Sequence, residues 1–305
     1  MSDSNPALHV PVLLGPVLEA AVGRTRAVDA TLGHGGHAAA LHESGLQVLG
    51  IDRDPDAIAT ARARLGTAIQ YLEAPYESKS AIDAATAFRP DFVLLDLGVS
   101  SRQLDEADRG FTFRPGAPLD MRMGAAEATA ADLLNAESES SLERVLADYG
   151  DERRARRLAR EIVRRRARHP FAISDDFVNA IRAVLGPRAG PPDFARLFQA
   201  IRIAVNDELD GLARALPAFR DALTPGGKLA VIAYHSGEDR LVKQSFRDWA
   251  SSCVCPPRQP VCTCRGRALG RLIPRKPIVP TDDEVAANPR GRSAKLRIFQ
   301  VDDAP

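Results

Sequence analysis

The sequence has almost no net charge, no long apolar run and no basic leader, and each absence narrows what the chain can be. Its 305 residues hold 41 basic and 40 acidic side chains, so the charge of +1 argues neither for nor against a nucleic-acid partner. No apolar run approaches the roughly 18 residues that a membrane-spanning helix requires. The opening MSDSNPALHVPVLLG carries an acidic residue and only a short apolar run, unlike a signal peptide. We therefore expect a cytoplasmic protein without a membrane partner.

Cysteine is also scarce, and all four cysteines lie in the segment CVCPPRQPVCTC at 253–264. In a cytoplasmic protein such residues are thiols or metal ligands rather than disulfides. Two C-x-C pairs can close a tetrahedral structural zinc site, with the intervening prolines stiffening the loop. The ligands would be Cys253, Cys255, Cys262 and Cys264. Zinc knuckles more often use C-x-x-C, so reduced surface thiols stay the alternative.

Short apolar runs alternate with helical segments in the first hundred residues and return in the last hundred. The runs predicted as strands are 26–31, 47–52, 68–74, 91–98, 228–234 and 294–301. Strands that alternate with helices are typical of βαβ units around a parallel sheet. The sequence therefore predicts an α/β protein with a doubly wound, Rossmann-like sheet.

The interval between Asp96 and Lys228 is far longer than the roughly 10–12 residues that a βαβ crossover needs. Its apolar residues recur at helical spacing. The predicted helical segments are 131–150, ending at Gly150 as a C-cap, then 151–169, 174–186 and 193–223. We therefore predict an inserted all-helical domain at 104–205, within a discontinuous domain formed by 1–103 and 206–305.

The stretch DATLGHGGH joins the first predicted strand to a helix. Gly33, Gly35 and Gly36 form G-x-G-G, and Asp52 ends the next strand, where Rossmann units bind a ribose diol. The third glycine of the dinucleotide fingerprint is missing, and the carboxylate of Asp29 would repel a pyrophosphate. The same carboxylate suits the cationic end of S-adenosylmethionine, so the loop favours a methyl donor over NAD. A structural glycine turn with an ordinary strand-end aspartate stays the alternative.

Two other predicted strands end in residues suited to chemistry. Asp96 ends the strand 91–98, beside the switch point where open α/β sheets bind ligands. Its carboxylate can accept hydrogen bonds from an amine and so localise the nitrogen lone pair, while a helix-capping role is the alternative. His235 follows the strand 228–234 and is a candidate proton acceptor, with a structural role as the alternative.

Basic residues gather in the predicted insertion and before the last strand. RGFTFRPGAPLDMRM at 109–123 interleaves arginines with aromatics, a pattern suited to bases and phosphates, or else to a linker whose phenylalanines plug a domain junction. The segment 151–169 carries nine arginines between Arg153 and Arg168, which either track a phosphate backbone or form the solvated face of an amphipathic helix. The candidate RNA-binding residues are Arg109, Arg114, Arg122, Arg157, Arg164 and Arg290.

Seven motifs along the chain together carry a resemblance to a known family. In order, they are HVPVLL, DATLGHGGH, IDRDPDAI, LLDLGVSSRQLDEADRGFTFRPGAPLDMRM, LFQAIRIAVNDEL, TPGGKLAVIAYHSGEDRLVK and NPRGRSAKLR. Motifs of this kind occur in this order in the bacterial small-subunit ribosomal RNA cytosine-N4 methyltransferases, which the chain resembles over nearly its whole length. The blocks DLGVSS and PLDMRM are far more specific than the glycine loop.

The resemblance implies a class I S-adenosylmethionine-dependent enzyme that methylates the N4 amine of a cytosine in the decoding region. It also implies 16S rRNA or the small ribosomal subunit as partner, and a helical insertion that helps to hold RNA. The implied donor-binding residues are Gly35, Gly36, His37, Asp52, Tyr76, Asp96 and Gln103. Two positions depart from the usual pattern: Tyr76 stands where phenylalanine is common, and YHSGEDR, with a loosening Gly237, replaces FHSLEDR.

We therefore expect Asp96 to orient the target amine of a cytosine splayed out of its RNA, and His235 to receive a proton directly or through water. A small-molecule methyltransferase is one alternative, although it would not need the arginine-rich insertion. An RNA-binding assembly protein that kept the donor fold is another, against which Asp29, Gly35 and Asp52 argue. Methyl transfer needs no metal, so any zinc would be structural. Whether the chain is a monomer or a homodimer stays open.

Overall fold

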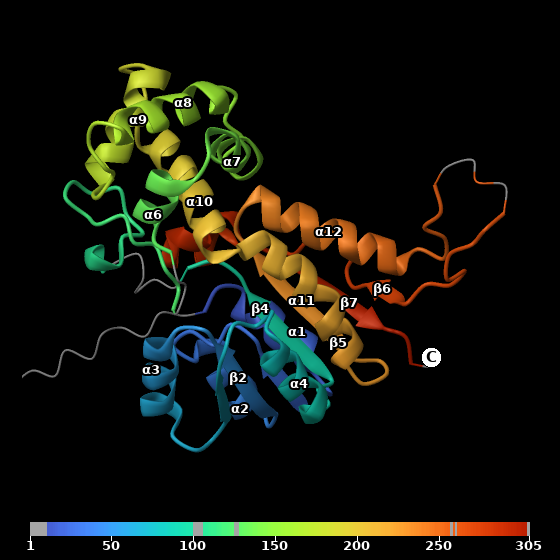
Figure 1. Ribbon diagram of the computed structural model, residues 1–305. Coiled ribbons are helices and arrows are strands. Elements are labelled where there is room, and N and C mark those ends of the chain that lie inside the picture. Colours follow the sequence, from blue (N-terminus) through green and yellow to red (C-terminus); the bar gives the residue numbers. More distant parts are fainter. Residues whose placement is uncertain (1–10, 100–105, 125–127, 257–258, 260, 304–305) are drawn as a thin grey trace, which may run out of the picture. The chain divides into compact units, whose positions relative to one another are not determined.

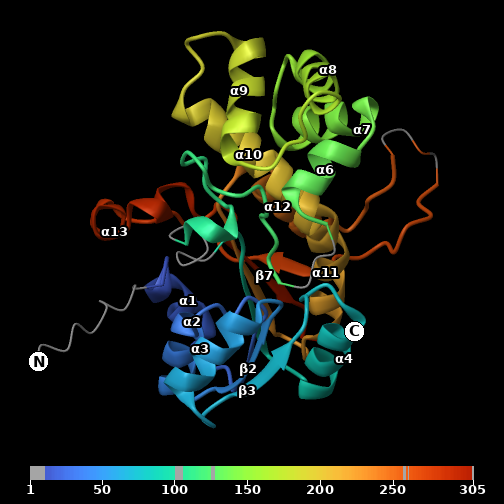
Figure 2. The same ribbon diagram turned by 60° about the vertical axis from the view of Figure 1, so that its left-hand side comes forward.

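The structure, a computed structural model, describes residues 11–99, 106–124, 128–256, 259 and 261–303. The chain divides into two compact units, which are described separately below (Figures 1 and 2). The sheet unit comprises the chain up to Gly98 and from Gly211 onward, and the helical unit is Val99–Asp210. The predicted insertion, 104–205, falls inside the limits of the helical unit. Among the described helices, none is long and apolar enough to cross a membrane.

A seven-stranded sheet of order β3-β2-β1-β4-β5-β7-β6 forms the centre of the sheet unit. Its strands are β1 (Arg26–Asp29), β2 (Gln47–Asp52), β3 (Gln70–Glu73), β4 (Phe92–Asp96), β5 (Lys228–Ala233), β6 (Gly270–Leu272) and β7 (Lys295–Val301). Strands β1 to β5 are parallel, whereas β7 runs antiparallel to both β5 and β6. The parallel part follows the doubly wound order, with its switch point between β1 and β4.

Six of these strands coincide with the predicted runs, within a few residues at their ends. The seventh, β6, is only three residues long and was not predicted. Such a short strand carries no alternation that a sequence pattern can reveal. Its place in the sheet comes from pairing with β7, where Gly270 lies opposite Val301. A side chain at Gly270 would collide with the carbonyl oxygen of Gln300 at 2.0 Å, so only glycine fits there.

Helices cover both faces of the sheet (Figure 1). The helices of this unit are α1 (Leu14–Ala21), α2 (Gly36–Glu43), α3 (Pro55–Leu65), α4 (Lys79–Phe88), α11 (Glu208–Ala222), α12 (Ser236–Ala250) and α13 (Asp282–Ala287). In β4, Phe92 and Leu94 pack with α1, α2 and α3, whereas Val93 and Leu95 pack with α4, α11 and α12. Because all four side chains are fully buried, β4 reads as a continuous apolar run, as expected for a parallel strand covered on both faces.

The regular elements of the helical unit are helices and helical turns. They are η1 (Ala107–Arg109), α6 (Ala130–Ala136), α7 (Glu139–Arg144), the π-helical turn η2 (Val145–Tyr149), α8 (Ala155–Arg166), α9 (Ser174–Leu185) and α10 (Pro191–Asn206). They share one apolar core, in which the Phe177 and Phe198 rings lie 5.1 Å apart. This core is separate from the two apolar layers of the sheet unit.

Two predicted helices are each divided in the structure. The segment 131–150 becomes α6, α7 and η2, because Ser138 caps a new helix by accepting a hydrogen bond from the Ser141 N–H at 3.1 Å. The segment 193–223 breaks at Asp207, whose φ of 52° ends α10 in the left-handed region.

Gly150 is the C-cap of η2, as predicted, but it does not adopt the left-handed conformation common at helix ends. Its φ is −102°, so this glycine is not left-handed. A Cβ there would lie 2.7 Å from the Leu146 carbonyl oxygen and 3.2 Å from the Cβ of Ala200. Glycine is therefore required by the close approach of α10, not by the conformation of a helix end.

Candidate active site

Three aspartates end three neighbouring strands of the sheet. Asp29 ends β1, Asp52 ends β2 and Asp96 ends β4, and β1 lies between the other two. Because these strands are parallel, the three carboxylates belong to the same edge of the sheet, which we call the carboxylate edge. All three residues were singled out from the sequence, and the fold brings them to one place beside the glycine loop.

The glycine loop is fixed to the carboxylate edge through Asp52. The Gly33 N–H donates to Asp52 Oδ2 at 2.7 Å, and the Asp54 N–H donates to Oδ1 at 2.9 Å. Burial raises the pKa of Asp52. Gly35 has a φ of 73° at the start of α2, and a Cβ on Gly36 would lie 2.7 Å from the ring of Pro11. The loop therefore needs its glycines both for backbone conformation and for space.

Asp29 is the most deeply buried of the three aspartates, at 1% exposure. Its Oδ1 accepts a hydrogen bond from the Thr31 N–H at 3.3 Å. Among the described residues, Oδ2 is buried without any hydrogen-bond partner. Burial raises the pKa of Asp29 to about 6. A buried acceptor without a donor is costly, so this oxygen marks where a donor group of a ligand would be stabilised.

Asp96 is held by contacts from three other parts of the sheet unit. The Tyr234 hydroxyl donates to Asp96 Oδ1 at 2.8 Å, and the Asp96 N–H donates to Thr31 Oγ1 at 2.6 Å. Asp96 Oδ2 lies 3.6 Å from His37 Nδ1. Burial raises the pKa of Asp96 to about 7, although the Tyr234 hydrogen bond opposes this shift. A carboxyl group with this pKa gains and loses a proton near neutral pH.

His37 was assigned to the site only by resemblance, and the structure gives it a defined orientation. Its Nε2 lies 3.1 Å from the Val12 carbonyl oxygen, which can only accept, so Nε2 carries the proton. Burial lowers the pKa of His37, which favours the neutral ring. Nδ1 is then an acceptor facing Asp96. The Asp96 and His37 side chains can therefore share the proton of a neutral Asp96 carboxyl group.

His235 caps α12. Its Nδ1 accepts from the Glu238 N–H at 3.4 Å, and Glu238 Oε2 accepts in return from the backbone N–H groups of Tyr234 and His235. His235 Nε2 lies 3.1 Å from Glu238 Oε1 but without the geometry of a hydrogen bond. These contacts give His235 a structural role at the start of α12. Its role as proton acceptor stays a prediction.

Tyr234 is the site residue that sequence reasoning missed. The sequence shows it only as the tyrosine of YHSGEDR, where phenylalanine is usual, and predicts no role for its hydroxyl group. The available signal was its position directly after β5, the strand that pairs with β4. Tyr76 follows β3 and is partly buried against the core of the sheet unit. Gln103 lies outside the described residues.

Both aromatic residues of the segment 109–123 pack against the apolar core of the helical unit. Phe111 is buried, and Phe113 packs edge-on to Phe194 and Phe198 within the helical unit. These contacts favour the alternative in which the phenylalanines fill a protein core, although Phe113 is partly exposed, and stacking on bases stays a prediction.

The arginines of this segment differ in how many of their guanidinium donors are engaged within the protein. Arg122 forms a two-point ion pair with Asp120, with both N···O distances at 2.8 Å. Arg109 reaches the Arg122 carbonyl oxygen at 3.4 Å. Arg114 is exposed, and its side chain makes no hydrogen bond or ion pair with another described residue. Arg114 is therefore the strongest of the three for a ligand phosphate. The remaining candidate, Arg290, is exposed in the turn η3 (Pro289–Ser293) of the sheet unit.

The arginine-rich helix α8 is amphipathic, as predicted. Ala155, Leu158, Ala159 and Ile162 are buried. Arg164 is exposed but forms a two-point ion pair with Glu161, at 2.6 and 2.8 Å. Arg157 is also exposed and makes no hydrogen bond or ion pair with any described residue. Of the two arginines of α8 that were predicted to bind RNA, Arg157 therefore has all its side-chain donors available, whereas Arg164 has two of its donors engaged by Glu161.

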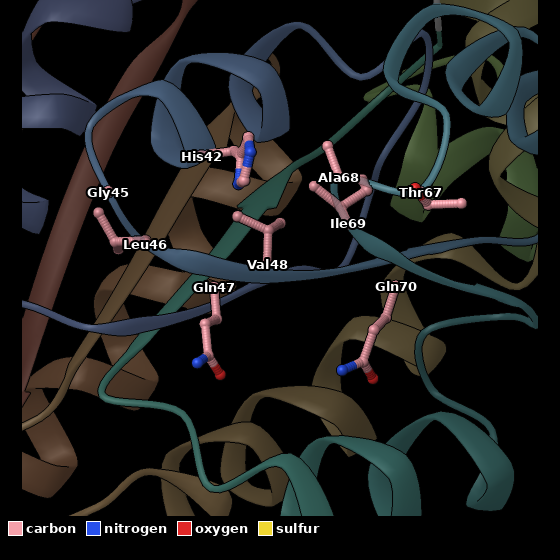
Figure 3. A pocket seen from close by; sticks show the side chains of 9 residues that line it. All are labelled: His42, Gly45, Leu46, Gln47, Val48, Thr67, Ala68, Ile69 and Gln70. Carbon is pink, nitrogen blue, oxygen red and sulfur yellow. The ribbon is translucent and has the colours of Figure 1, made fainter.

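A shallow pocket lies at the opposite edge of the sheet unit (Figure 3). It is lined by residues that include His42, Gln47 and Gln70, where β2 and β3 begin. The carboxylate edge is at the other end of these strands. This pocket therefore contains none of the residues that the sequence singled out.

Comparison with known proteins decides the family. The model of a family described as the MraW methylase family matches residues 6–302. The chain belongs to the MraW methylase family. A ribosomal RNA small subunit methyltransferase H from Gemmatimonas aurantiaca is 60% identical over 298 residues, covering 96% of this chain and 95% of its own length. A protein of the same name from Heliobacterium modesticaldum is 48% identical over 303 residues, covering 95% of this chain and 97% of its own length.

Membership of the MraW methylase family confirms the resemblance inferred from the seven motifs. It also agrees with the sheet order, which is doubly wound as predicted and carries a helical insertion between β4 and β5. The predicted fold class, a Rossmann-like class I methyltransferase sheet with an inserted helical part, is confirmed.

Proposed function

We propose that this protein transfers a methyl group from S-adenosylmethionine to the exocyclic N4 amine of a cytosine in the decoding region of 16S rRNA. The observation that carries the proposal is the carboxylate edge, where the buried Asp29 and the partly buried Asp52 and Asp96 surround a glycine loop. Among the described residues, Asp29 Oδ2 has no donor. Three acids with few cationic partners suit a cationic ligand rich in hydrogen-bond donors.

The chemistry of these residues fits a methyl donor that carries an ammonium group, a sulfonium and a ribose. Asp29 Oδ2 would accept from the ammonium group, and the free lone pairs of Asp52 would accept from the ribose hydroxyls. Gly35, Gly36 and His37 would form the wall of the donor site, and Tyr76 would lie near the adenine. When bound, S-adenosylmethionine supplies an electrophilic methyl group. A dinucleotide would instead place a pyrophosphate against Asp29, which is unfavourable.

Asp96 is the residue that we assign to the target amine. The Tyr234 hydroxyl occupies Oδ1, so Oδ2 is the oxygen left to accept a hydrogen bond from N4. Such a bond localises the nitrogen lone pair and orients it for in-line attack. After N4 has gained a methyl group it must lose one proton, and Asp96 Oδ2 would take it. His37 Nδ1, 3.6 Å away, is placed to share that proton.

The RNA substrate is inferred from the relatives and from the arginines of the helical unit. Both relatives described above are named as methyltransferases of small-subunit ribosomal RNA. In this chain, Arg114 and Arg157 have guanidinium groups available for phosphates. A methyltransferase of small molecules would gain nothing from such residues.

Identification of the methylated nucleoside tests the proposal. The full-length protein is incubated with labelled S-adenosylmethionine and small ribosomal subunits, or free ribosomal RNA, that lack the modification, and the RNA is digested to nucleosides. We expect the label in N4-methylcytidine. Label in another nucleoside would contradict the assigned acceptor. No label, despite donor binding by calorimetry, would contradict RNA methylation itself while leaving the donor site intact.

A further inference from the structure

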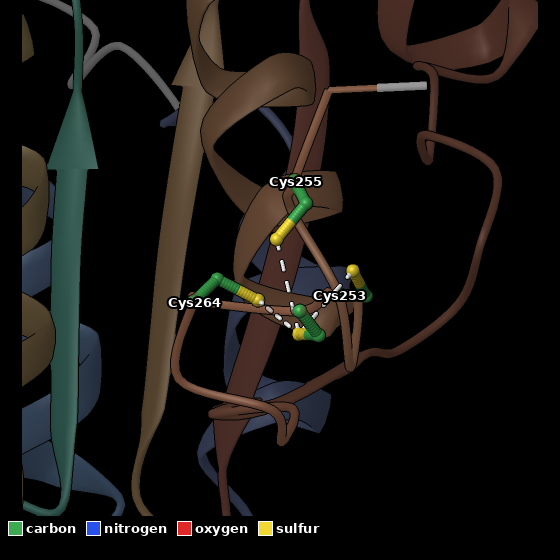
Figure 4. Close-up of side chains that lie close together, drawn as sticks. Cys253, Cys255 and Cys264 are labelled. Carbon is green, nitrogen blue, oxygen red and sulfur yellow. Dashed lines mark hydrogen bonds between the residues drawn. The ribbon is translucent and has the colours of Figure 1, made fainter. Parts of the chain in front are cut away.

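The loop between α12 and β6 contains a cluster of four sulfur atoms that the proposed reaction does not use. The ligand atoms of Cys253, Cys255, Cys262 and Cys264 all lie within 4.8 Å of one another. The Cys262 sulfur lies at the centre, 3.9 Å from that of Cys253, 3.8 Å from that of Cys255 and 3.4 Å from that of Cys264. Figure 4 shows the labelled cysteines turned toward a common point. We propose that these four thiolates bind one zinc ion.

The sulfur spacing is that of a tetrathiolate metal site. A tetrahedron with zinc–sulfur bonds of about 2.3 Å has edges of about 3.8 Å. The three distances from Cys262 span this value. A disulfide would instead require a sulfur–sulfur bond of about 2.05 Å. All four cysteines are free in this structure, so the cluster is not made of disulfides.

Apolar burial does not explain why the loop folds in this way. Val254 lies between Cys253 and Cys255, and Val261 directly precedes Cys262. Their side chains are 44% and 70% exposed. Cys253 and Cys262 are exposed too. Ordering such a loop costs conformational entropy, which the described side chains do not offset by packing in a core. A metal bound by four thiolates supplies that free energy, as in small domains whose folding depends on zinc.

The surrounding backbone supports negatively charged sulfur. The Val254 N–H donates to the Cys264 sulfur at 3.4 Å, across the two arms of the loop. Such donors favour a thiolate over a thiol. At the end of the loop, Arg265 donates to the Ser251 carbonyl oxygen at 2.8 Å and to the Asp248 carbonyl oxygen, which fixes the second arm to the end of α12. The two arms that carry the ligands are therefore held together at the base of the loop.

The donor set favours zinc over harder cations. Thiolates select zinc, copper(I) or iron, whereas magnesium and calcium prefer oxygen ligands. With all four positions taken by protein ligands, the site leaves none for water or substrate, so its role is structural. The site is independent of the carboxylate edge.

Metal analysis of the full-length protein, purified without chelator, tests the proposal. We expect about one zinc ion per chain. After exchange for cobalt(II), we expect the visible bands of a tetrahedral ion and intense thiolate-to-cobalt charge-transfer absorption. Absence of metal with four reactive thiols, or two disulfides in the protein handled without reductant, would overturn the proposal. Finding iron in place of zinc would contradict the assignment of zinc to this site.

A matched pair of variants locates the site. Cys262→Ser removes the central sulfur, and we expect loss of at least 90% of the bound zinc, or about tenfold or greater loss in affinity. Val254→Ala changes an exposed side chain between two ligands, and we expect full zinc content. Equal zinc content in both variants would contradict the assignment. Should Cys262→Ser not fold, removal of zinc from the unmodified protein by a chelator, with increased proteolysis of the loop reversed by zinc, gives the same test.

Discussion

The sheet unit and the helical unit handle charge in opposite ways. At the carboxylate edge, the buried Asp29 and the partly buried Asp96 have pKa values raised to about 6 and about 7. In α8, Glu161 has its pKa lowered to about 2 by hydrogen bonds from Arg164 and Arg165. The carboxylate edge thus leaves its charges poorly compensated, whereas α8 compensates the charge of Glu161. Uncompensated buried charge is costly and is often retained at sites where a ligand compensates it. We therefore assign the proposed chemistry to the sheet unit and contact with the RNA substrate to the helical unit.

The most severe test of this comparison is Asp96→Asn, which keeps the shape and removes the proton acceptor. We expect the turnover number to fall by about 10²- to 10⁴-fold, the usual contribution of a general base, while donor binding by calorimetry is retained. Asp83→Asn is the matched control, because Asp83 is exposed and, among the described residues, its side chain pairs with Lys79 alone. Activity within a fewfold of the unmodified protein for Asp96→Asn would remove Asp96 from the reaction.

Asp29→Asn should weaken the donor site rather than the chemistry. Loss of a charged acceptor for the donor's ammonium group is expected to raise the dissociation constant for S-adenosylmethionine by about tenfold to a hundredfold. Calorimetry at pH 8, where Asp29 is ionised, measures this effect. Unchanged affinity would mean that Asp29 Oδ2 faces something other than the donor.

The same variant should change how stability depends on pH. The pKa of Asp29 is about 6 in the folded protein and 3.8 unfolded, so the folded state holds a proton that the unfolded state has released. The resulting stability is complete below pH 3.8 and is lost as the pH rises to about 6, by about 3 kcal/mol at most. Without donor, the melting temperature of Asp29→Asn should therefore rise relative to the unmodified protein between pH 4 and pH 7. A constant difference would contradict the raised pKa.

Tyr234→Phe should produce a smaller and more specific effect. The Tyr234 hydroxyl stabilises the ionised form of Asp96, so its removal raises the pKa of Asp96 further. We expect the acidic limb of the pH–rate profile to move to higher pH, with activity largely recovered above pH 8 and donor binding unchanged. An unchanged pH–rate profile would indicate that the Tyr234 ring only fills space and that its hydroxyl does not act on Asp96.

The smallest effects are expected in the helical unit. Arg157→Ala removes an arginine whose donors are available, and we expect a weakening of RNA binding by a fewfold and a salt-dependence slope lower by about one. Arg164→Ala, on the same helix, removes a guanidinium engaged by Glu161 and should change the slope less. The comparison between the units would fail if the Arg164 variant lost as much affinity as the Arg157 variant.

Much of the fold was predictable because its strands and helices show characteristic local patterns of apolar residues in the sequence. The buried strands are continuous apolar runs such as 92–95, and α8 shows its buried side at helical spacing. The breaks at Ser138 and Asp207 were missed, since a serine or aspartate inside a helical pattern reads as an ordinary surface residue. For the candidate site, the sequence located the strand-end aspartates. The Tyr234–Asp96 hydrogen bond joins residues 138 positions apart, and no local pattern contains it.

The way the helical unit is joined to the sheet bears on how such proteins diversify. The chain leaves at Gly98, directly after β4, and resumes at Gly211 in α11, which leads into β5, the parallel neighbour of β4. Without the intervening residues, β4, α11 and β5 would still form an ordinary βαβ module. The entropy of closing a connection grows only slowly with its length, so this joint tolerates modules of very different size. Evolution, or an engineer, can therefore exchange the inserted helical unit while the sheet is inherited unchanged.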